Sequence, residues 1–347
     1  MRRPDPATPP APDDPSGPAR KADHVRIAAG AGVEHARGPG LEGVRLRHRA
    51  LPERALADVG LQTRLLGAAL EAPLVVSAMT GGTEEGGEIN RRLARAAAEH
   101  GIALVLGSGR RLLDDPATLG TYRPEGGLRP PLLLANLGAA QLRGPQGPER
   151  AARLVGLLEA DGLSIHLNPI QEAVQPEGES DFTGVLAGIA AAVERLAPLP
   201  VLVKEVGFGL DDEDVRLLAG AGVAAVDVAG AGGTNWALIE GRREPAAGAV
   251  AAAFADWGHP TADALAAARS AAPGLPVVAS GGLRDGVDVA KCLALGASAA
   301  GLARPLLLAA RDDRAGEAVA TVIDQLRIAT WAAGAPSADA LGEAHLA

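Results

Sequence analysis

Eight short apolar segments, separated by stretches with helical periodicity, constrain the fold of this 347-residue chain more than any other feature. Each is a continuous run of Val, Leu, Ile and Ala, too short for a helix and without the alternation of a half-exposed strand. The expected strands cover residues 74–77, 103–106, 132–135, 162–165, 201–203, 224–228, 277–279 and 299–302. The expected helices include residues 89–100, 148–160, 183–196, 211–221, 260–271 and 286–295. This alternation predicts a parallel sheet that is buried on both faces.

The number of strands favours closure into a (β/α)8 TIM barrel of the α/β class, which needs about 250 residues. The competing architecture is an open doubly wound sheet, but residues 78–83 lack the glycine spacing that such a sheet places after its first strand. We therefore expect the barrel to span residues 74–335, preceded by a segment at 20–73 and followed by a tail at 336–347. Residues 1–19 contain seven prolines and few large apolar residues, which predicts disorder.

Glycine or polar residues follow every expected strand. In a parallel barrel the chemistry lies in the loops at the carboxyl ends of the strands. In chain order these loops carry Ala78, Met79 and Thr80, Ser108 and Arg110, Asn136, His166, Lys204, Thr234, Gly282, Leu283 and Arg284, and Ala303 and Arg304. We therefore expect one site at this face of the barrel.

The densest polar cluster, His166, Asn168, Gln171 and Glu172, follows the fourth strand. A packed core has no use for so many polar groups at the end of a buried strand. Glu172 is the candidate metal ligand, because Mg²⁺ is often held by one carboxylate together with substrate phosphates. Zinc is the alternative, although the helical His-Glu-x-x-His spacing is absent. His166 as a core histidine is the other interpretation.

Two glycine loops follow the seventh and eighth strands, at residues 280–286 and 301–304. Loops at these positions commonly bind a phosphate, because their backbone N–H groups point at the anion. Arg284 adds a positive charge there. The alternative is a pair of turns that only join strand to helix.

Lys204 ends an apolar strand and is expected at the barrel mouth, where an unpaired cation is costly. In flavin-binding barrels such a lysine stabilises the reduced ring. An ion pair with Glu205 and a Schiff-base lysine are the alternatives.

The overall composition excludes several classes of protein. A net charge of −9 with scattered cations argues against a nucleic-acid partner. No apolar run reaches the ~18 residues of a membrane span, and the N-terminus lacks the apolar core of a signal peptide. A cytoplasmic protein is expected. The single cysteine, Cys292, lies in an apolar helical pattern that predicts a buried, inert thiol.

Taken in order, the motifs resemble those of type 2 isopentenyl diphosphate isomerases from about residue 20 to 306. They are Arg-Lys-x-x-His at 20–24, Ala-Met-Thr-Gly-Gly at 78–82, Ala-Asn-Leu-Gly-Ala at 135–139, His-Leu-Asn-Pro-Ile-Gln-Glu at 166–172, Lys-Glu-Val-Gly-Phe-Gly at 204–209, Gly-Ala-Gly-Gly-Thr-Asn-Trp at 230–236 and Ser-Gly-Gly-Leu-Arg at 280–284. The fourth is the specific one. The glycine loops are shared with other FMN barrels.

The resemblance implies a barrel that binds FMN, Mg²⁺ and a C5 isoprenoid diphosphate, with NADPH or NADH as reductant of the flavin and a homo-tetramer or homo-octamer as assembly. The reduced flavin would carry the proton, and Gln171 would assist or orient. The residues implied for FMN are Ala78, Met79, Thr80, Ser108, Asn136, Lys204, Thr234, Gly282, Leu283, Arg284, Ala303 and Arg304. Those implied for substrate and catalysis are Arg20, Lys21, His24, Ser108, Arg110, His166, Asn168 and Gln171, with Glu172 on the metal.

Two positions depart from the family pattern. Ala229 stands where relatives often have a hydroxyl residue, and Gly109 where they often have Gln, so one hydrogen bond in each pocket is in question. Two other functions remain open. One is an FMN-dependent oxidoreductase that acts on a 2-hydroxy acid or dihydroorotate, and the other is a catalytically silent flavin- or diphosphate-binding protein.

Overall fold

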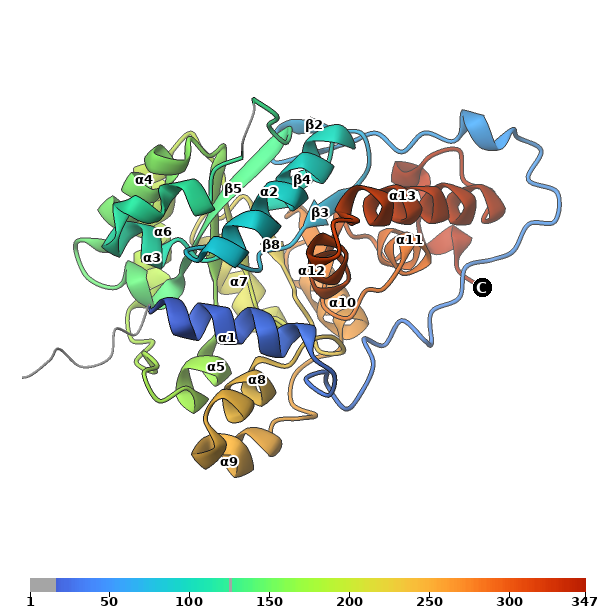
Figure 1. Ribbon diagram of the computed structural model, residues 1–347. Coiled ribbons are helices and arrows are strands. Elements are labelled where there is room, and N and C mark those ends of the chain that lie inside the picture. Colours follow the sequence, from blue (N-terminus) through green and yellow to red (C-terminus); the bar gives the residue numbers. More distant parts are fainter. Residues whose placement is uncertain (1–16, 125–126) are drawn as a thin grey trace, which may run out of the picture.

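A closed barrel of eight parallel strands forms the centre of the computed structural model, which describes residues 17–124 and 127–347 (Figure 1). The strand order around the barrel is β10-β3-β4-β5-β6-β7-β8-β9, and every neighbouring pair is parallel. The strands are β3 (Leu74–Val76), β4 (Ala103–Val105), β5 (Leu132–Gly138), β6 (Gly162–His166), β7 (Val201–Lys204), β8 (Ala225–Asp227), β9 (Val277–Ser280) and β10 (Ala299–Leu302). All eight predicted strands are therefore confirmed.

Helices surround the barrel and connect consecutive strands. They are α1 (Pro18–Ala29), α2 (Glu84–Glu99), α3 (Arg110–Asp114), α4 (Gly147–Leu158), α5 (Pro169–Val174), α6 (Val185–Leu196), α7 (Asp212–Gly220), α8 (Trp236–Arg243), α9 (Gly248–Ala252), α10 (Thr261–Ala271), α11 (Gly286–Ala294), α12 (Arg304–Arg311) and α13 (Ala315–Ala332). Helix α2 shows why such segments form. The Thr83 hydroxyl accepts a hydrogen bond from the Gly86 amide at its start, and Ile89 and Leu93 are buried on one face.

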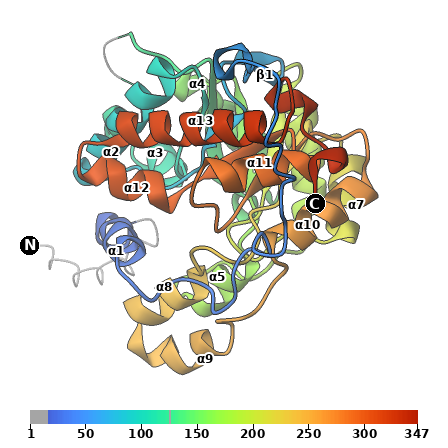
Figure 2. The ribbon, with the colours of Figure 1, turned by 90° about the vertical axis from the view of Figure 1, so that its right-hand side faces the viewer.

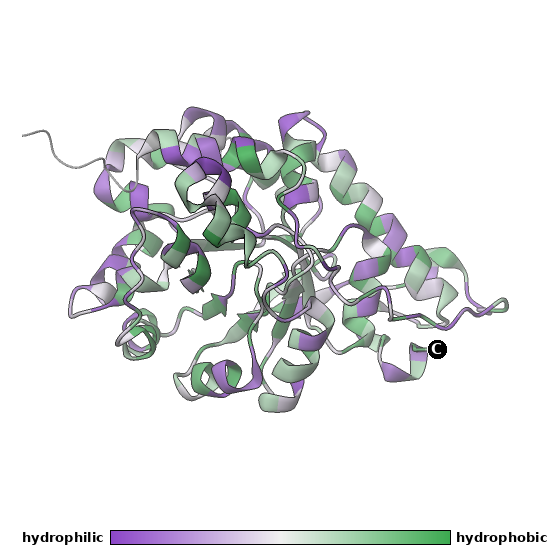
Figure 3. Cartoon of the chain, turned by 90° about the horizontal axis from the view of Figure 1, so that it is seen from below, coloured by the Kyte–Doolittle hydropathy of each residue, from purple (hydrophilic) through white to green (hydrophobic). Residues whose placement is uncertain are grey.

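The continuous apolar strands are buried on both faces, as their composition predicts. Alternate residues such as Val75, Leu134 and Val278 form a cluster inside the barrel, and Leu65 and Leu70 pack against it. The last two belong to a hairpin of β1 (Thr63–Leu65) and β2 (Ala68–Leu70). This hairpin and α1 lie at opposite ends of the barrel in Figure 1. Viewed from below, the strands at the centre are mainly hydrophobic and the outer helices carry the hydrophilic residues (Figure 3).

The N-terminal expectation needs one correction. Residues 1–16 lie outside the described part of the chain, but residues 18 and 19, assigned above to a disordered tail, already belong to α1. Proline is tolerated there because the first helical turn has no partner for its missing N–H. Helix α1 lies near α8, at the same end of the barrel as α5 (Figures 1 and 2).

Two expectations from composition can be compared with the fold. Cys292 is fully buried, as predicted, and burial raises the pKa of its thiol. In the described residues, no helix combines the length and the apolar character needed to cross a bilayer.

Candidate functional site

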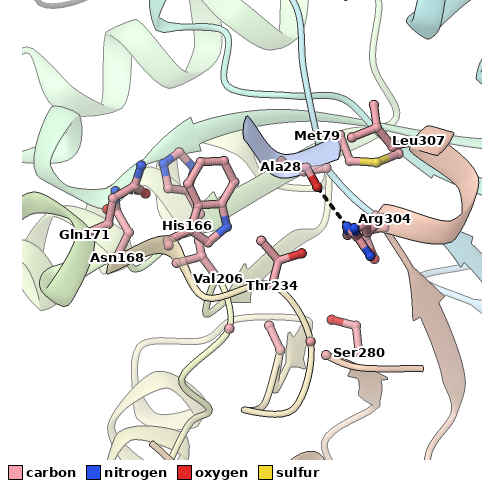
Figure 4. Close-up of a pocket in the computed structure, with 18 of the residues that line it drawn as sticks. Ala28, Met79, His166, Asn168, Gln171, Val206, Thr234, Ser280, Arg304 and Leu307 are labelled. Atoms are coloured by element: carbon pink, nitrogen blue, oxygen red, sulfur yellow. Dashed lines mark hydrogen bonds between the residues drawn. The ribbon is translucent and has the colours of Figure 1, made fainter. Parts of the chain in front are cut away.

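A cavity of about 550 Å³ opens at the carboxyl ends of the strands. Its lining comes from α1 and from the loops that follow all eight barrel strands. Every site residue predicted from the sequence lines it: Arg20, Lys21, His24, Ala78, Met79, Thr80, Ser108, Arg110, Asn136, His166, Asn168, Gln171, Glu172, Lys204, Thr234, Gly282, Leu283, Arg284, Ala303 and Arg304. Figure 4 shows Gln171, Asn168 and His166 on one side of this space, with Met79 and Arg304 on the other. The barrel thus gathers residues that lie up to 284 positions apart, from Arg20 to Arg304.

Three cations line the side of the cavity that faces α1. Burial lowers the pKa of the Arg20 guanidinium, and its Nε atom is buried without a hydrogen-bond partner. Arg110 forms an ion pair of 2.7 Å with Glu179, which lies in the loop after α5. Lys21 is partly buried, and desolvation, followed by repulsion from Arg20, lowers the pKa of its ammonium group to about 7. A buried orphan donor beside two further cations is a local anion site within an acidic protein.

A buried carboxylate that the sequence analysis missed, Glu240, lies behind the same side of the cavity. Its Oε1 atom accepts a hydrogen bond from Gln171 Nε2 at 2.8 Å and lies 2.9 Å from His24 Nε2. Its Oε2 atom accepts from Arg243 Nε at 2.8 Å. Burial acts to raise the pKa of Glu240, but these donors outweigh it and lower the pKa to about 2. Glu240 is therefore ionised at neutral pH and holds Gln171, with His24 in contact.

Glu172 lies beside Gln171, and each of its carboxylate oxygens accepts a hydrogen bond from the protein. Asn168 Nδ2 donates to Glu172 Oε1 at 2.9 Å and to Gln171 Oε1 at 3.1 Å. The Glu179 amide donates to Glu172 Oε2 at 2.6 Å. Within the described residues, no three His, Cys, Asp or Glu side chains gather into a metal cage. The donor set therefore suits a hard cation that takes its other oxygens from a substrate and water, and it does not suit zinc.

His166 is enclosed and neutral. Its Nδ1 atom lies 3.0 Å from Asn136 Oδ1, an acceptor, so we assign the proton to Nδ1. Burial, with nearby Lys204 and Lys21, lowers the pKa of His166 to about 3. With the proton on Nδ1, the ring leaves Nε2 as an acceptor.

Lys204 is buried at the end of β7, but it is not ion-paired with Glu205, which was one of the alternatives. Its Nζ donates to the backbone carbonyl of Glu205. The Glu205 carboxylate accepts from three backbone amides of residues 206–208, and burial raises its pKa to about 7. The Lys204 charge acts on the neighbouring buried Asp227 and faces the cavity that Lys204 lines.

The loops after β8, β9 and β10 form a wall made mainly of backbone. A Cβ atom on Gly233 would lie 2.5 Å from the Gly282 amide nitrogen, and one on Gly281 would overlap the Gly230 carbonyl oxygen. On the neighbouring floor, Ser77 Oγ and Thr80 Oγ1 are buried without a partner. Bare amides and orphan hydroxyls fit the phosphate and the polar ring edge of FMN.

Two predicted FMN ligands also have protein partners. Arg284 forms a two-point pair with Asp288, and its side chain is 60% exposed. Arg304 donates to the carbonyls of Ala28 and Gly30, so it ties the end of α1 to the barrel (Figure 4). Both still line the cavity, but much of their donor capacity is committed.

Of the two departures from the family pattern, Gly109 has a local explanation and Ala229 has none. A Cβ atom on Gly109 would lie 2.5 Å from Leu154 Cδ1, so a longer side chain requires Leu154 to move. Ala229 adopts a left-handed backbone with a φ of 37°, and its amide donates to Asp227 Oδ1 at 3.1 Å.

Comparison with known proteins was made for sequence and for structure. A family model described as FMN-dependent dehydrogenase matches residues 185–347. The isopentenyl-diphosphate delta-isomerase of Cronobacter sakazakii is 49% identical, covering 89% of this chain and 90% of that protein. The protein of the same name from Xanthobacter autotrophicus is 48% identical, covering 94% and 97%.

Among solved structures, flavocytochrome b2 with benzoylformate superimposes with a TM-score of 0.70 at 17% identity, covering 94% of this chain and 82% of that chain. Mandelate oxidase with (S)-mandelic acid has a TM-score of 0.66 at 22% identity, covering 94% and 92%. At these identities the likeness concerns the fold alone.

Proposed function

The chain belongs to the isopentenyl-diphosphate delta-isomerase family, and from this premise we propose how its cavity carries out the reaction. The enzyme interconverts isopentenyl diphosphate and dimethylallyl diphosphate, in isoprenoid biosynthesis, with the use of FMN. The observation that carries the assignment of residues is the single cavity that all the family motifs line. One wall of the cavity carries cations and another consists of glycine backbone. The Gln171 carboxamide, held by hydrogen bonds, lies beside them.

The cationic wall supports binding of the diphosphate. Arg20 and Arg110 provide planar donors for phosphate oxygens, Lys21 provides an ammonium group, and His24 lines the same side. Arg110 is paired with Glu179, so the substrate competes with that carboxylate for the guanidinium. Glu172 would hold Mg²⁺ against the diphosphate, with water completing the oxygen shell.

The backbone wall and floor would hold FMN through the glycine loops, Ser77, Thr80, Ser108, Asn136, Lys204 and Thr234. When bound and reduced, FMN supplies an electron-rich ring and a nitrogen that can carry a proton. Lys204 is a cation at the barrel mouth, where it favours a negative charge on the reduced ring. Ala78, Met79, Leu283 and Ala303 also line the cavity.

The residues beside Glu240 would control the proton transfer. Moving a double bond requires that one carbon gain a proton and another lose one, and an alkene is a very weak base, so the acid must be held in place. Gln171 is held by Glu240 and Asn168, which fixes the direction of its carboxamide. His166 remains neutral and offers an acceptor, and Trp236 packs against His24 with ring centroids 5.3 Å apart.

The family resemblance also supports NADPH as the reductant, a cytoplasmic location and a homo-tetramer or homo-octamer. We retain these as proposals, together with a substrate partner that is a C5 isoprenoid diphosphate and not a nucleic acid or membrane.

The test is an anaerobic assay of the purified protein with FMN, Mg²⁺, NADPH and isopentenyl diphosphate, which follows dimethylallyl diphosphate. We expect turnover that far exceeds NADPH consumption. Glu172→Ala should lower kcat/KM by about 100-fold or more, because a bound metal contributes several kcal/mol to such reactions. Glu194→Ala, at an exposed carboxylate of α6, is the matched control and should change little. Bound FMN with no product, but turnover of a hydroxy acid, would assign the protein to the oxidoreductases instead.

A further inference from the structure

Tyr122, the only tyrosine of the chain, lies beneath the cationic wall and is fully buried. It directly follows the 3-10 helix η2 (Pro116–Thr121) in the chain. Its hydroxyl accepts a hydrogen bond from Lys21 Nζ at 2.8 Å and donates one to the Ser108 carbonyl at 2.9 Å. Lys21 Nζ also donates to that carbonyl, at 2.9 Å. The three groups form a closed ring of hydrogen bonds between α1, the loop after β4 and η2.

The aromatic ring of Tyr122 also supports the loop after β3. A Cβ atom on Gly81 would overlap the ring, and one on Gly82 would lie 3.0 Å from the hydroxyl oxygen. Tyr122 therefore contacts three of the segments that line the cavity, although it does not itself line it.

The Lys21 ammonium has fewer hydrogen-bond acceptors than donors, and neither acceptor is charged. Its three N–H groups meet two neutral oxygens, and within the described residues no carboxylate lies within ion-pair distance of it. Asp114 attracts the ammonium from beyond that distance, while Arg20 and Arg111 repel it. A partly buried cation with more repulsion than attraction is costly, and Lys21 borders the cavity. One donor thus remains for an anionic oxygen in that cavity.

We propose that Tyr122 is a positioning residue for substrate binding: its hydroxyl holds the Lys21 ammonium so that the remaining N–H meets an oxygen of the diphosphate. This inference rests on the proposed function, because it takes the diphosphate as the ligand of Lys21. The phenol stays protonated, since burial raises its pKa, and so it remains a donor to Ser108 while it accepts from Lys21.

Tyr122→Phe in the FMN-loaded protein tests the proposal, because it removes one oxygen and keeps the ring. We expect the Kd for inorganic diphosphate with Mg²⁺, measured by calorimetry, to rise about tenfold, as for a lost hydrogen bond to a charged group. The KM for isopentenyl diphosphate should rise in parallel, with kcat changed less than about twofold. Thr118→Val is the matched control, because it removes a hydroxyl of the same 3-10 helix that bonds only the Asp115 carbonyl.

A double-mutant cycle distinguishes positioning from a general structural effect. In a Lys21→Met background, Tyr122→Phe should raise the Kd no further, because its effect passes through the ammonium. An unchanged Kd in Tyr122→Phe alone, or the same increase in both backgrounds, would overturn the proposal. An unchanged Kd in Lys21→Met would remove Lys21 from the diphosphate site, and with it both this inference and that part of the proposed function. If Lys21→Met weakens binding and Tyr122→Phe does not, only the inference about Tyr122 fails.

A spectroscopic measurement covers the case in which the phenylalanine variant does not fold. Because the chain has one tyrosine, growth with tyrosine labelled with ¹³C at Cζ reports on Tyr122 alone. We expect its resonance to shift when diphosphate is added to the FMN-loaded protein, and to remain unchanged in Lys21→Met. A chemical shift that does not change when diphosphate is added to the unmodified chain would refute the proposal.

Discussion

Two walls of the cavity use opposite physical means. The charged wall, defined as Arg20, Lys21, His24, Gln171 and Glu172 with Glu240 behind them, consists of long polar side chains held by one another. The glycine wall, defined as Gly232, Gly233, Gly281 and Gly282, presents backbone to the cavity without side chains. The first wall recognises charge and responds to protonation, whereas the second recognises shape and has no group that titrates.

The two walls should respond differently to substitution. On the charged wall, a change of one atom alters hydrogen bonds but leaves the volume unchanged, so binding and rate should change while the fold persists. On the glycine wall, any added carbon meets backbone that cannot move aside, so the cofactor site itself should be lost.

Gly281→Ala should have the largest effect. Gly281 has a φ of 104°, and an added Cβ would overlap the Gly230 carbonyl oxygen. Strain and overpacking each cost about 1–3 kcal/mol, so we expect FMN affinity to fall about 100-fold, measured by flavin titration. Gly184→Ala is the control, because Gly184 has a φ of 79° but no atom within 4 Å of a Cβ there. Equal losses in both variants would mean that backbone strain, and not close approach, defines this wall.

Glu240→Gln should have the next largest effect. The change keeps the volume but sets the new NH2 group against the donor of either Gln171 or Arg243, whichever way the amide is turned. Hydrogen bonds to charged groups contribute about 1.5–3 kcal/mol, so we expect kcat/KM to fall about 10- to 100-fold with FMN content preserved. Because the pKa of Glu240 is about 2, the native carboxylate should not add a titration to the pH profile at neutral pH. A variant that loses FMN would show that the two walls are not independent.

The smallest effect should come from pH, through Lys21. Its pKa is lowered to about 7, so the ammonium is present below that pH and is lost as the pH rises through it. Diphosphate affinity should therefore fall by about fivefold across this range relative to Lys21→Arg, whose guanidinium stays protonated. Calorimetry at matched pH values measures the ratio. A constant ratio would mean that Lys21 is charged throughout or does not meet the ligand.

The fold was largely predictable because it leaves a strong local pattern. Strands buried on both faces appear as continuous apolar runs, and parallel neighbours require helices between them, so all eight strands could be placed before any contact was known. The site face was predictable for the same reason, since the carboxyl ends of parallel strands meet at one end of a barrel. Helix α1 was missed because prolines near its start indicate disorder when they are read without tertiary contacts.

The partners within the site were not predictable. Glu240 lies 216 positions from His24 and Tyr122 lies 101 from Lys21, and neither has a neighbouring motif that distinguishes it from an ordinary helix or turn residue. The strand pattern places Lys204 at the barrel mouth. Whether its ammonium meets the Glu205 carboxylate or the Glu205 backbone carbonyl depends on side-chain geometry, and the structure has the carbonyl. These pairings exist only once the chain is folded.

The sequence by itself determined the barrel, the face that carries the chemistry and the residues that reach it, because these follow from burial and from the direction of parallel strands. Only the tertiary structure decided which groups hold one another: Glu240 with Gln171 and His24, Tyr122 with Lys21, and bare backbone with bare backbone at Gly233 and Gly282. The physical reason is the distance along the chain over which each interaction acts. Secondary structure depends on periodicity within about ten residues, whereas hydrogen bonds and close approach act over a few ångströms between segments that the chain separates by a hundred residues or more.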